Sequence, residues 1–180
     1  MTDPTPSGRL FKRLYISLQD LGTARQFAEY LLKKRWHYDA WEKRGSIYLQ
    51  QSAFTTSLIV FYARPFTKSY GLPEFPRALV TYGNEEEKLH QTILDLRHQV
   101  YAHSDSSRYQ VTPFREREFI SAILRAPFFK LERSRVLRLR RMITKLINAT
   151  ESEMGRVLSE IESGNLTTGS KSDAPEAARA

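Results

Sequence analysis

The sequence predicts an all-α fold, a helical bundle that carries one small β-hairpin ahead of a long C-terminal helix. Three observations predict it. Apolar residues recur with a helical period in several separate stretches. Prolines, glycines and capping residues stand between those stretches. Only the segment from about 109 to 124 changes to an alternating pattern rich in β-branched and aromatic side chains.

A first helix is indicated by the apolar residues Leu21, Ala24, Phe27, Ala28 and Leu31. Its start has two candidates, a capping box of Thr23 with Gln26 or a cap at Asp20. Residues 1–8 hold two prolines and a glycine and are expected to be unpacked. The expected organisation is a disordered N-terminus over 1–8, a helical domain over 9–163 and a disordered polar tail over 164–180.

A second helix is expected to begin after Gly45 and Ser46. Pro65 should end it near Ala63, because the residue before a proline is forced out of the α region. Its periodic positions are Ile47, Gln51, Phe54, Leu58 and Phe61.

A third helix is expected to begin at Asn84 as the cap, with Glu87 at the reciprocal capping position. Its apolar stripe comprises Leu89, Ile93, Leu96 and Val100.

The hairpin is expected to pair the segment around Val111 with "EFISAIL", with Pro113 between the strands. A long helix then follows from about 132 to 162. Its buried side is expected at Leu139, Ile143, Leu146, Thr150, Met154, Val157 and Ile161.

Composition narrows the class of protein. Hydrophobic residues make up 41% of the 180 residues, which is enough for a core. Cysteine is absent, which excludes disulfides and thiol chemistry and is compatible with the cytoplasm, where we expect the protein. No apolar run approaches the ~20 residues that cross a bilayer, and no secretion signal is recognised. The net charge of +8 favours anionic partners, nucleic acid first.

One stretch of the third helix, "LDLRHQVYAHSDSS" from Leu94 to Ser107, concentrates reactive side chains. Arg97 and Tyr101 are four residues apart and share a helix face. His103 would point ~120° away from Arg97 and lie ~9 Å further along a straight helix. The two side chains converge only if the helix ends near His103, or if a second copy of the helix packs alongside.

A histidine with an arginine suits metal-independent cleavage of RNA. The 2′-hydroxyl is the built-in nucleophile, so the protein supplies proton transfer and stabilises negative charge on the phosphate. No metal-binding or phosphate-cradling motif is present, so no cofactor is expected. A plainer interpretation stays open. A histidine in the last turn of a helix often serves the helix dipole, and a flanking arginine often makes a surface ion pair.

The residues "LRHQVYAHSD" resemble the signature of the HEPN superfamily: an arginine, a polar residue and then a histidine near the end of a helix. The order of the surrounding segments resembles its abortive-infection, AbiU-like branch. The segments are "FYARPF", "VYAHSD", "VTPF" and "APFFKLERSRVLRLRRMITKLI", and the similarity spans about 20 to 163.

That resemblance implies a helical bundle that forms a homodimer across the signature helices. Active members are metal-independent RNases of toxin–antitoxin, abortive-infection and antiviral systems. By this resemblance Arg97 would hold the phosphate and His103 would transfer protons. His98 takes a position that is more often asparagine, and Tyr101 would contact RNA or simply pack. An antitoxin or a nucleotidyltransferase is among the partners it suggests, and non-catalytic members also exist.

Other basic residues have two interpretations each. Arg64 and Lys68, near Tyr62 and Tyr70, would add cations and stacking faces to an RNA cleft, or belong to a solvated loop. Basic residues such as Arg133, Arg140 and Arg141 of the stretch 125–145 form a phosphate-facing strip or a solvated helix face.

Two isolated histidines, His37 and His90, have no metal-ligand partner at a useful spacing, and Trp36 and Trp41 are expected in the core or an interface.

Our first hypothesis is therefore a homodimeric endoribonuclease. The alternative is a non-catalytic helical dimer that binds a protein or a nucleic acid. A DNA-binding regulator is a third option, which no helix-turn-helix pattern supports.

Overall fold

The computed structural model describes residues 5–39, 42–43, 45–98, 110–116, 119–125 and 130–169. The helices among them are α1 (Pro6–Lys34), α2 (Ile47–Ala63), α3 (Asn84–Leu96) and α4 (Arg133–Gly169). Two 3-10 turns, η1 (Arg64–Phe66) and η2 (Arg77–Leu79), follow α2, and the strands β1 (Gln110–Glu116) and β2 (Phe119–Arg125) precede α4. This confirms the predicted helical fold with a small hairpin before the long last helix.

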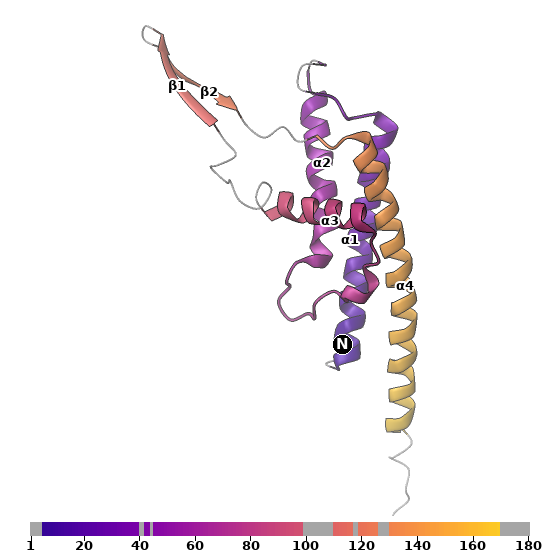
Figure 1. The fold of residues 1–180 in the computed structure, drawn as a ribbon. Coiled ribbons are helices and arrows are strands. Elements are labelled where there is room, and N and C mark those ends of the chain that lie inside the picture. Colours follow the sequence, from indigo (N-terminus) through magenta and orange to yellow (C-terminus); the bar gives the residue numbers. More distant parts are fainter. Residues whose placement is uncertain are drawn as a thin grey trace, which may run out of the picture.

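The helices form one bundle, in which α1 is the central element. It runs antiparallel to α4 along most of its length and packs against α2 on another side, and α3 crosses the other helices at a steep angle (Figure 1). The shared core is made of aliphatic side chains from all four helices, with Tyr62 as its largest fully buried member. The end of α3 points toward the hairpin, which stands apart from the bundle (Figure 1).

Helix α1 begins much earlier than either expected start. Pro6 is its first residue, and the Thr5 hydroxyl accepts a hydrogen bond from the Gly8 N–H at 3.1 Å. Residues 6–8, expected to be unpacked, form its first turn. Asp20 and Thr23 are not caps but interior residues. Asp20 is buried against Arg64, and the Thr23 hydroxyl donates to the carbonyl four residues back.

Helix α2 was predicted correctly at both ends. It begins at Ile47 after Ser46 and ends at Ala63, two residues before Pro65. Pro65 continues the chain as the second residue of the 3-10 turn η1, because its missing N–H and the clash of its ring with the preceding turn do not permit further α-helix.

Helix α3 is displaced by one residue from its expected cap. Gly83 is the capping residue and Asn84 is already helical. Accordingly Glu86, not Glu87, turns back to accept from the Gly83 N–H at 3.3 Å. Three glutamates in the first turn complement the positive end of the helix dipole.

The hairpin pairs β1 with β2 in antiparallel register, from Gln110 opposite Arg125 to Glu116 opposite Phe119. Pro113 lies inside β1 opposite Ala122, and not between the strands as predicted. A two-stranded ribbon tolerates this, because each strand has one edge that needs no hydrogen bonds. Val111, Phe119 and Ile120 are 60 to 68% exposed.

Helix α4 continues to Gly169, beyond the predicted end near residue 162. Every position of its predicted buried stripe is buried or half-buried. Within the described residues, we find no helix with the length and apolar character needed to span a bilayer.

Candidate functional site

Arg97 and His98 lie where α3 ends. The inner face of α3 is anchored by the buried Leu89 and Ile93, and the next turn carries Arg97, partly exposed, and His98, exposed. The Arg97 N–H bonds to the carbonyls of both Ile93 and Leu94, and the backbone then widens into a π-turn at Arg97 and His98. Such turns are rare and occur frequently at functional sites. No residue pattern in the sequence signalled it.

The two side chains contact each other. Nη1 of Arg97 lies 3.3 Å from Nδ1 of His98. Because a guanidinium only donates, this hydrogen bond needs a neutral imidazole with its proton on Nε2. Among the described residues Arg97 makes no ion pair with a carboxylate. Its other N–H groups are therefore available for an external anion.

The remaining signature residues, Tyr101 and His103, lie outside the described residues, as does Trp41. The convergence of Arg97 with His103 therefore stays a prediction.

Arg64 and Lys68, predicted together, have different surroundings. Arg64 Nη1 lies 3.0 Å from Oδ1 of Asp20, and its guanidinium lies 5.3 Å from the ring centre of Phe61. Burial raises the pKa of the Asp20 carboxyl, and the positive charges of Arg64 and Arg13 oppose that shift. Arg64 thus compensates a buried carboxylate. Lys68 is exposed and makes no ion pair with any described residue.

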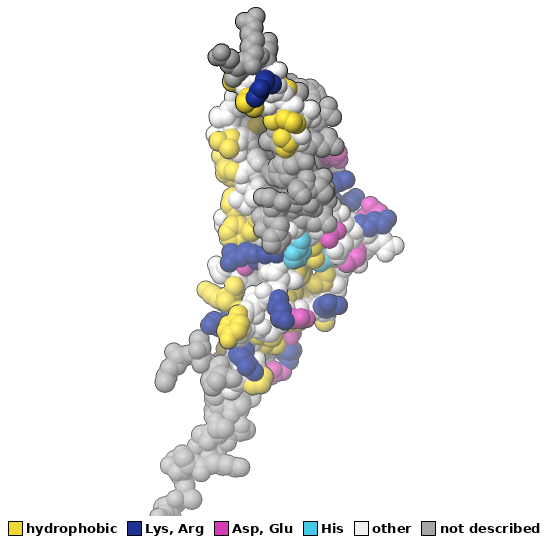
Figure 2. Space-filling view, turned by 90° about the vertical axis from the view of Figure 1, so that its left-hand side faces the viewer, with side chains coloured by type: hydrophobic (Ala, Val, Ile, Leu, Met, Phe, Trp, Pro, Cys, Tyr) yellow, Lys and Arg dark blue, Asp and Glu magenta, His cyan; other side chains and the backbone are white. Residues whose placement is uncertain are grey.

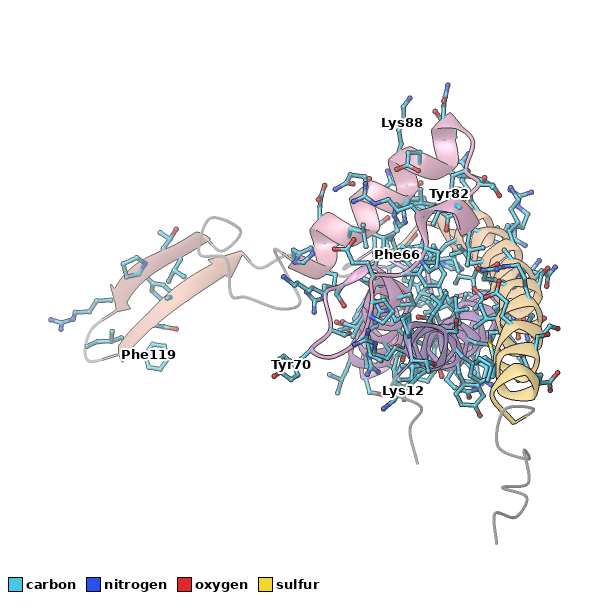
Figure 3. All side chains as sticks on the ribbon, turned by 90° about the horizontal axis from the view of Figure 1, so that it is seen from below. Lys12, Phe66, Tyr70, Tyr82, Lys88 and Phe119 are labelled. Atoms are coloured by element: carbon cyan, nitrogen blue, oxygen red, sulfur yellow. The ribbon has the colours of Figure 1, made fainter. Side chains whose placement is uncertain are left out.

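Lys68 belongs to a pocket of about 470 Å³ between α3 and the segment that joins α2 to α3. Its apolar lining includes Phe66, Phe75, Val80 and Leu94. Phe66 lies beneath α3, on the side that faces α1 and α2 (Figure 3). The polar lining includes Arg13, Lys68, Glu74, Arg77, Glu87 and His90. Of these lining residues, only Lys68 was predicted from the sequence to belong to a site.

Arg13 forms the buried wall of the pocket, only 3% exposed. Its Nη1 donates to Ser69 Oγ at 2.9 Å, and its Nη2 donates to the carbonyls of Pro65 and Thr67. Burial lowers the pKa of this guanidinium, and the negative charge of Asp20 opposes the shift. Arg13 was missed because an arginine inside a helical stretch looks like any surface residue.

His90 faces the same pocket at the end of a buried hydrogen-bond chain. Its Nδ1 lies 2.8 Å from the Tyr62 hydroxyl, which lies 3.0 Å from the Tyr82 hydroxyl. Burial lowers the pKa of His90, against the effect of Glu87. Burial also raises the pKa of both tyrosines. His90 is therefore neutral, and its Nε2 has no partner among the described residues.

The basic residues from Lys130 to Lys145, which lead into α4 and continue along it, divide into two sets. Lys130 pairs with Asp39 at 2.7 Å, and Arg138 and Lys145 pair with the α3 residues Glu85 and Glu86. A second set makes no ion pair with any described residue: Arg133, Arg135, Arg140 and Arg141. Figure 2 shows a different side of the molecule, the one on the left in Figure 1, where Lys, Arg and His side chains lie close to Asp and Glu side chains.

His37, the other isolated histidine, contacts the Leu131 carbonyl through Nδ1 at 2.9 Å. Within the described part of the chain, no three His, Asp or Glu side chains are grouped as metal ligands would be.

No family model matches the chain, and neither the curated proteins nor the solved structures contain a match.

Proposed function

We propose that the protein is a metal-independent endoribonuclease of HEPN type that acts as a homodimer. The contact between Arg97 and His98 carries the proposal. It places a guanidinium that has no carboxylate partner among the described residues beside an imidazole, at a π-turn where the helix leaves the core. The net charge of +8 suits a polyanionic substrate.

In the proposed reaction the 2′-hydroxyl of RNA loses its proton to an imidazole and attacks the neighbouring phosphorus. The P–O5′ bond breaks, O5′ takes up a proton, and the products carry a 2′,3′-cyclic phosphate and a 5′-hydroxyl. His103 is the proposed proton-transfer residue, and the two copies in a dimer would supply the base and the acid. Arg97 would hold the phosphate and stabilise its developing negative charge.

Supporting roles follow from the positions of the neighbours. We propose that His98 orients Arg97 and that Tyr101 contacts RNA. Lys68 would bind a flanking phosphate. Arg64 is proposed to support the site indirectly, because its guanidinium is already paired with Asp20. The dimer would form through the helix that contains Arg97.

The biological setting that we propose is that of a toxin or an abortive-infection or antiviral effector in the cytoplasm. In such a setting an antitoxin or a nucleotidyltransferase partner would restrain the RNase. The alternative function is a non-catalytic dimer that binds a protein or a nucleic acid. The exposed apolar side chains of the hairpin and the unpaired arginines of α4 favour that alternative.

The test compares wild type with His103→Ala on end-labelled RNA in EDTA. Matched far-UV circular dichroism and melting temperatures ensure equal folding. We expect only the wild type to cut the RNA and to leave cyclic-phosphate ends. The mass of the protein in solution should be that of a dimer. If both proteins bind RNA and neither cuts it, the RNase proposal is wrong and the non-catalytic alternative is supported.

A further inference from the structure

The pocket between α3 and the preceding segment combines unpaired charges of both signs. Lys68 and Arg77 are exposed at its wall and make no ion pair with any described residue. The same holds for the carboxylates of Glu74 and Glu87. Arg13 adds a buried positive charge that only neutral oxygens contact. The pocket thus presents positive and negative side chains whose charges are available to a bound ligand.

This mixture selects a ligand with matching features. A purely anionic ligand would meet two carboxylates, and a cationic one would meet three positive side chains. A ligand that carries both a phosphate and an amine donor satisfies both sets. The aromatic rings of Phe66 and Phe75, with centroids 5.5 Å apart, supply an apolar lining for a flat ring. The volume of about 470 Å³ is in the range of small-molecule sites.

We propose that this pocket reads one base of the RNA substrate and selects bases that carry an exocyclic amine. Glu87 and Glu74 would accept from the amine of adenine, cytosine or guanine, and Lys68 and Arg77 would hold the attached phosphate. Uracil has no such amine, and its single ring N–H donor, on N3, can match only one of the two carboxylates. Nε2 of His90 offers a further hydrogen bond to the base.

The position of the pocket along α3 ties it to the candidate catalytic residues, so that the assignment to RNA rests on the proposed function. Glu87, His90, Gln91 and Leu94 line the pocket at helical spacing. Arg97 and His98 occupy the next turn, about 4.5 to 6 Å further along the helix axis than Leu94. A base in the pocket therefore lies within about one nucleotide of a phosphate held by Arg97.

Binding is tested on the full-length His103→Ala protein, which should not cleave. Isothermal titration calorimetry compares AMP, CMP, GMP, UMP and inorganic phosphate, and then short oligoribonucleotides of adenosine and of uridine. We expect the amine-bearing bases to bind about tenfold more tightly than UMP and phosphate. Lys68→Ala should weaken that binding about tenfold, and Glu87→Gln should remove the preference over uracil. The controls Lys88→Ala and Glu85→Gln are on α3 outside the pocket and should change neither.

The two series identify the source of the nucleotide. Binding of the adenosine oligonucleotide that depends on Lys68 and Glu87 supports an RNA base in the pocket. Binding of mononucleotides alone supports a pocket for the free nucleotide and overturns the link to RNA. Equal affinities for all bases, or equal losses with Lys68→Ala and Lys88→Ala, overturn the pocket itself.

Cleavage by the wild type is scored separately, so the two proposals fail separately. Cutting without a base preference would contradict the base-reading pocket and support the RNase proposal. Base-selective binding without cutting would contradict the RNase proposal and support the base-selective pocket. When both hold, Glu87→Gln should also cut at uridine-flanked sites that the wild type spares.

Discussion

Nη1 of Arg64 lies 3.0 Å from Oδ1 of Asp20, and this ion pair joins the end of α2 to the buried side of α1. The carboxylate is nearly buried, whereas the arginine side chain is half exposed. Arg64 thus contributes to the fold at a position where the sequence also suggested contact with RNA. The same segment leads directly into the pocket that contains Lys68.

Replacing Arg64 by alanine should lower the free energy of unfolding by about 1 to 3 kcal/mol at pH 7, because the Asp20 carboxylate is left without its partner. The loss should be smaller near pH 4. Burial raises the pKa of Asp20, so its carboxyl takes up a proton at a higher pH than a free aspartate does, and the charge that needs Arg64 disappears. Urea denaturation at both pH values measures this.

The double variant with Asp20→Asn is the control. The free energy of unfolding that the double variant loses should be well below the sum of the two single losses, because each single change removes the same interaction. Strictly additive losses would show that the ion pair does not connect the two helices energetically.

Arg13→Met should destabilise the protein by about 2 to 4 kcal/mol and release the segment 65–69. The guanidinium is the common donor to Ser69 and to the Pro65 and Thr67 carbonyls. Arg13→Lys should recover only part of the loss, because an ammonium group lacks the planar fork. Hydrogen exchange of the segment, together with the melting temperature, measures both. Unchanged exchange at 65–69 in the Met variant would contradict this role.

The stability of the protein should fall as pH drops below about 6.5. Burial lowers the pKa of His90 and His37 in the folded state, so the unfolded chain binds protons that the folded chain does not. The loss begins near the unfolded pKa and ends at the folded one, with a slope of at most about 1.4 kcal/mol per pH unit for each histidine.

His90→Gln should flatten that dependence, and adding His37→Gln should flatten it further. Denaturant unfolding between pH 7.5 and 5 measures the slope. A double variant with the slope of the wild type would assign acid sensitivity to other groups.

Arg97→Ala should reduce RNA cleavage by about 10²- to 10⁴-fold while the melting temperature stays within a few degrees, because Arg97 has no described carboxylate partner. Arg97→Lys should recover little, since one ammonium cannot bind a phosphate bidentately. His98→Asn should retain most activity, because an amide oxygen can accept from Arg97 as Nδ1 does. Single-turnover rates measure all three. A large drop in melting temperature for Arg97→Ala would make its role structural.

The sequence predicted the helical fold and the hairpin, because those elements follow from the local spacing of apolar residues and from the prolines, glycines and capping residues between them. Helix α2 is the clearest case, since Pro65 dictates where it stops. The start of α1 was wrong because Arg13, Ser17 and Asp20 place polar side chains on its buried face and hide the apolar period. Their partners lie in distant segments, which no local pattern reveals.

The candidate site was predictable only in part. Arg97 and His98 were singled out from their chemistry. The π-turn, in contrast, depends on which carbonyls accept hydrogen bonds from the backbone amides. Of the two loop cations, the structure gives Arg64 a buried partner and leaves Lys68 open. Although only four positions separate Arg64 and Lys68, the two residues differ because only Arg64 meets the carboxylate of Asp20 on α1. The pocket itself is formed by segments that only folding brings together.

The hairpin projects from the bundle rather than packing into it (Figure 1). Its side chains Val111, Phe114, Phe119 and Ile120 are exposed and belong to no part of the core. Substitutions at Val111, Phe119 or Ile120 therefore leave the cooperative unfolding of the four helices nearly untouched. A foreign recognition sequence can be grafted onto this arm while the helical scaffold stays intact.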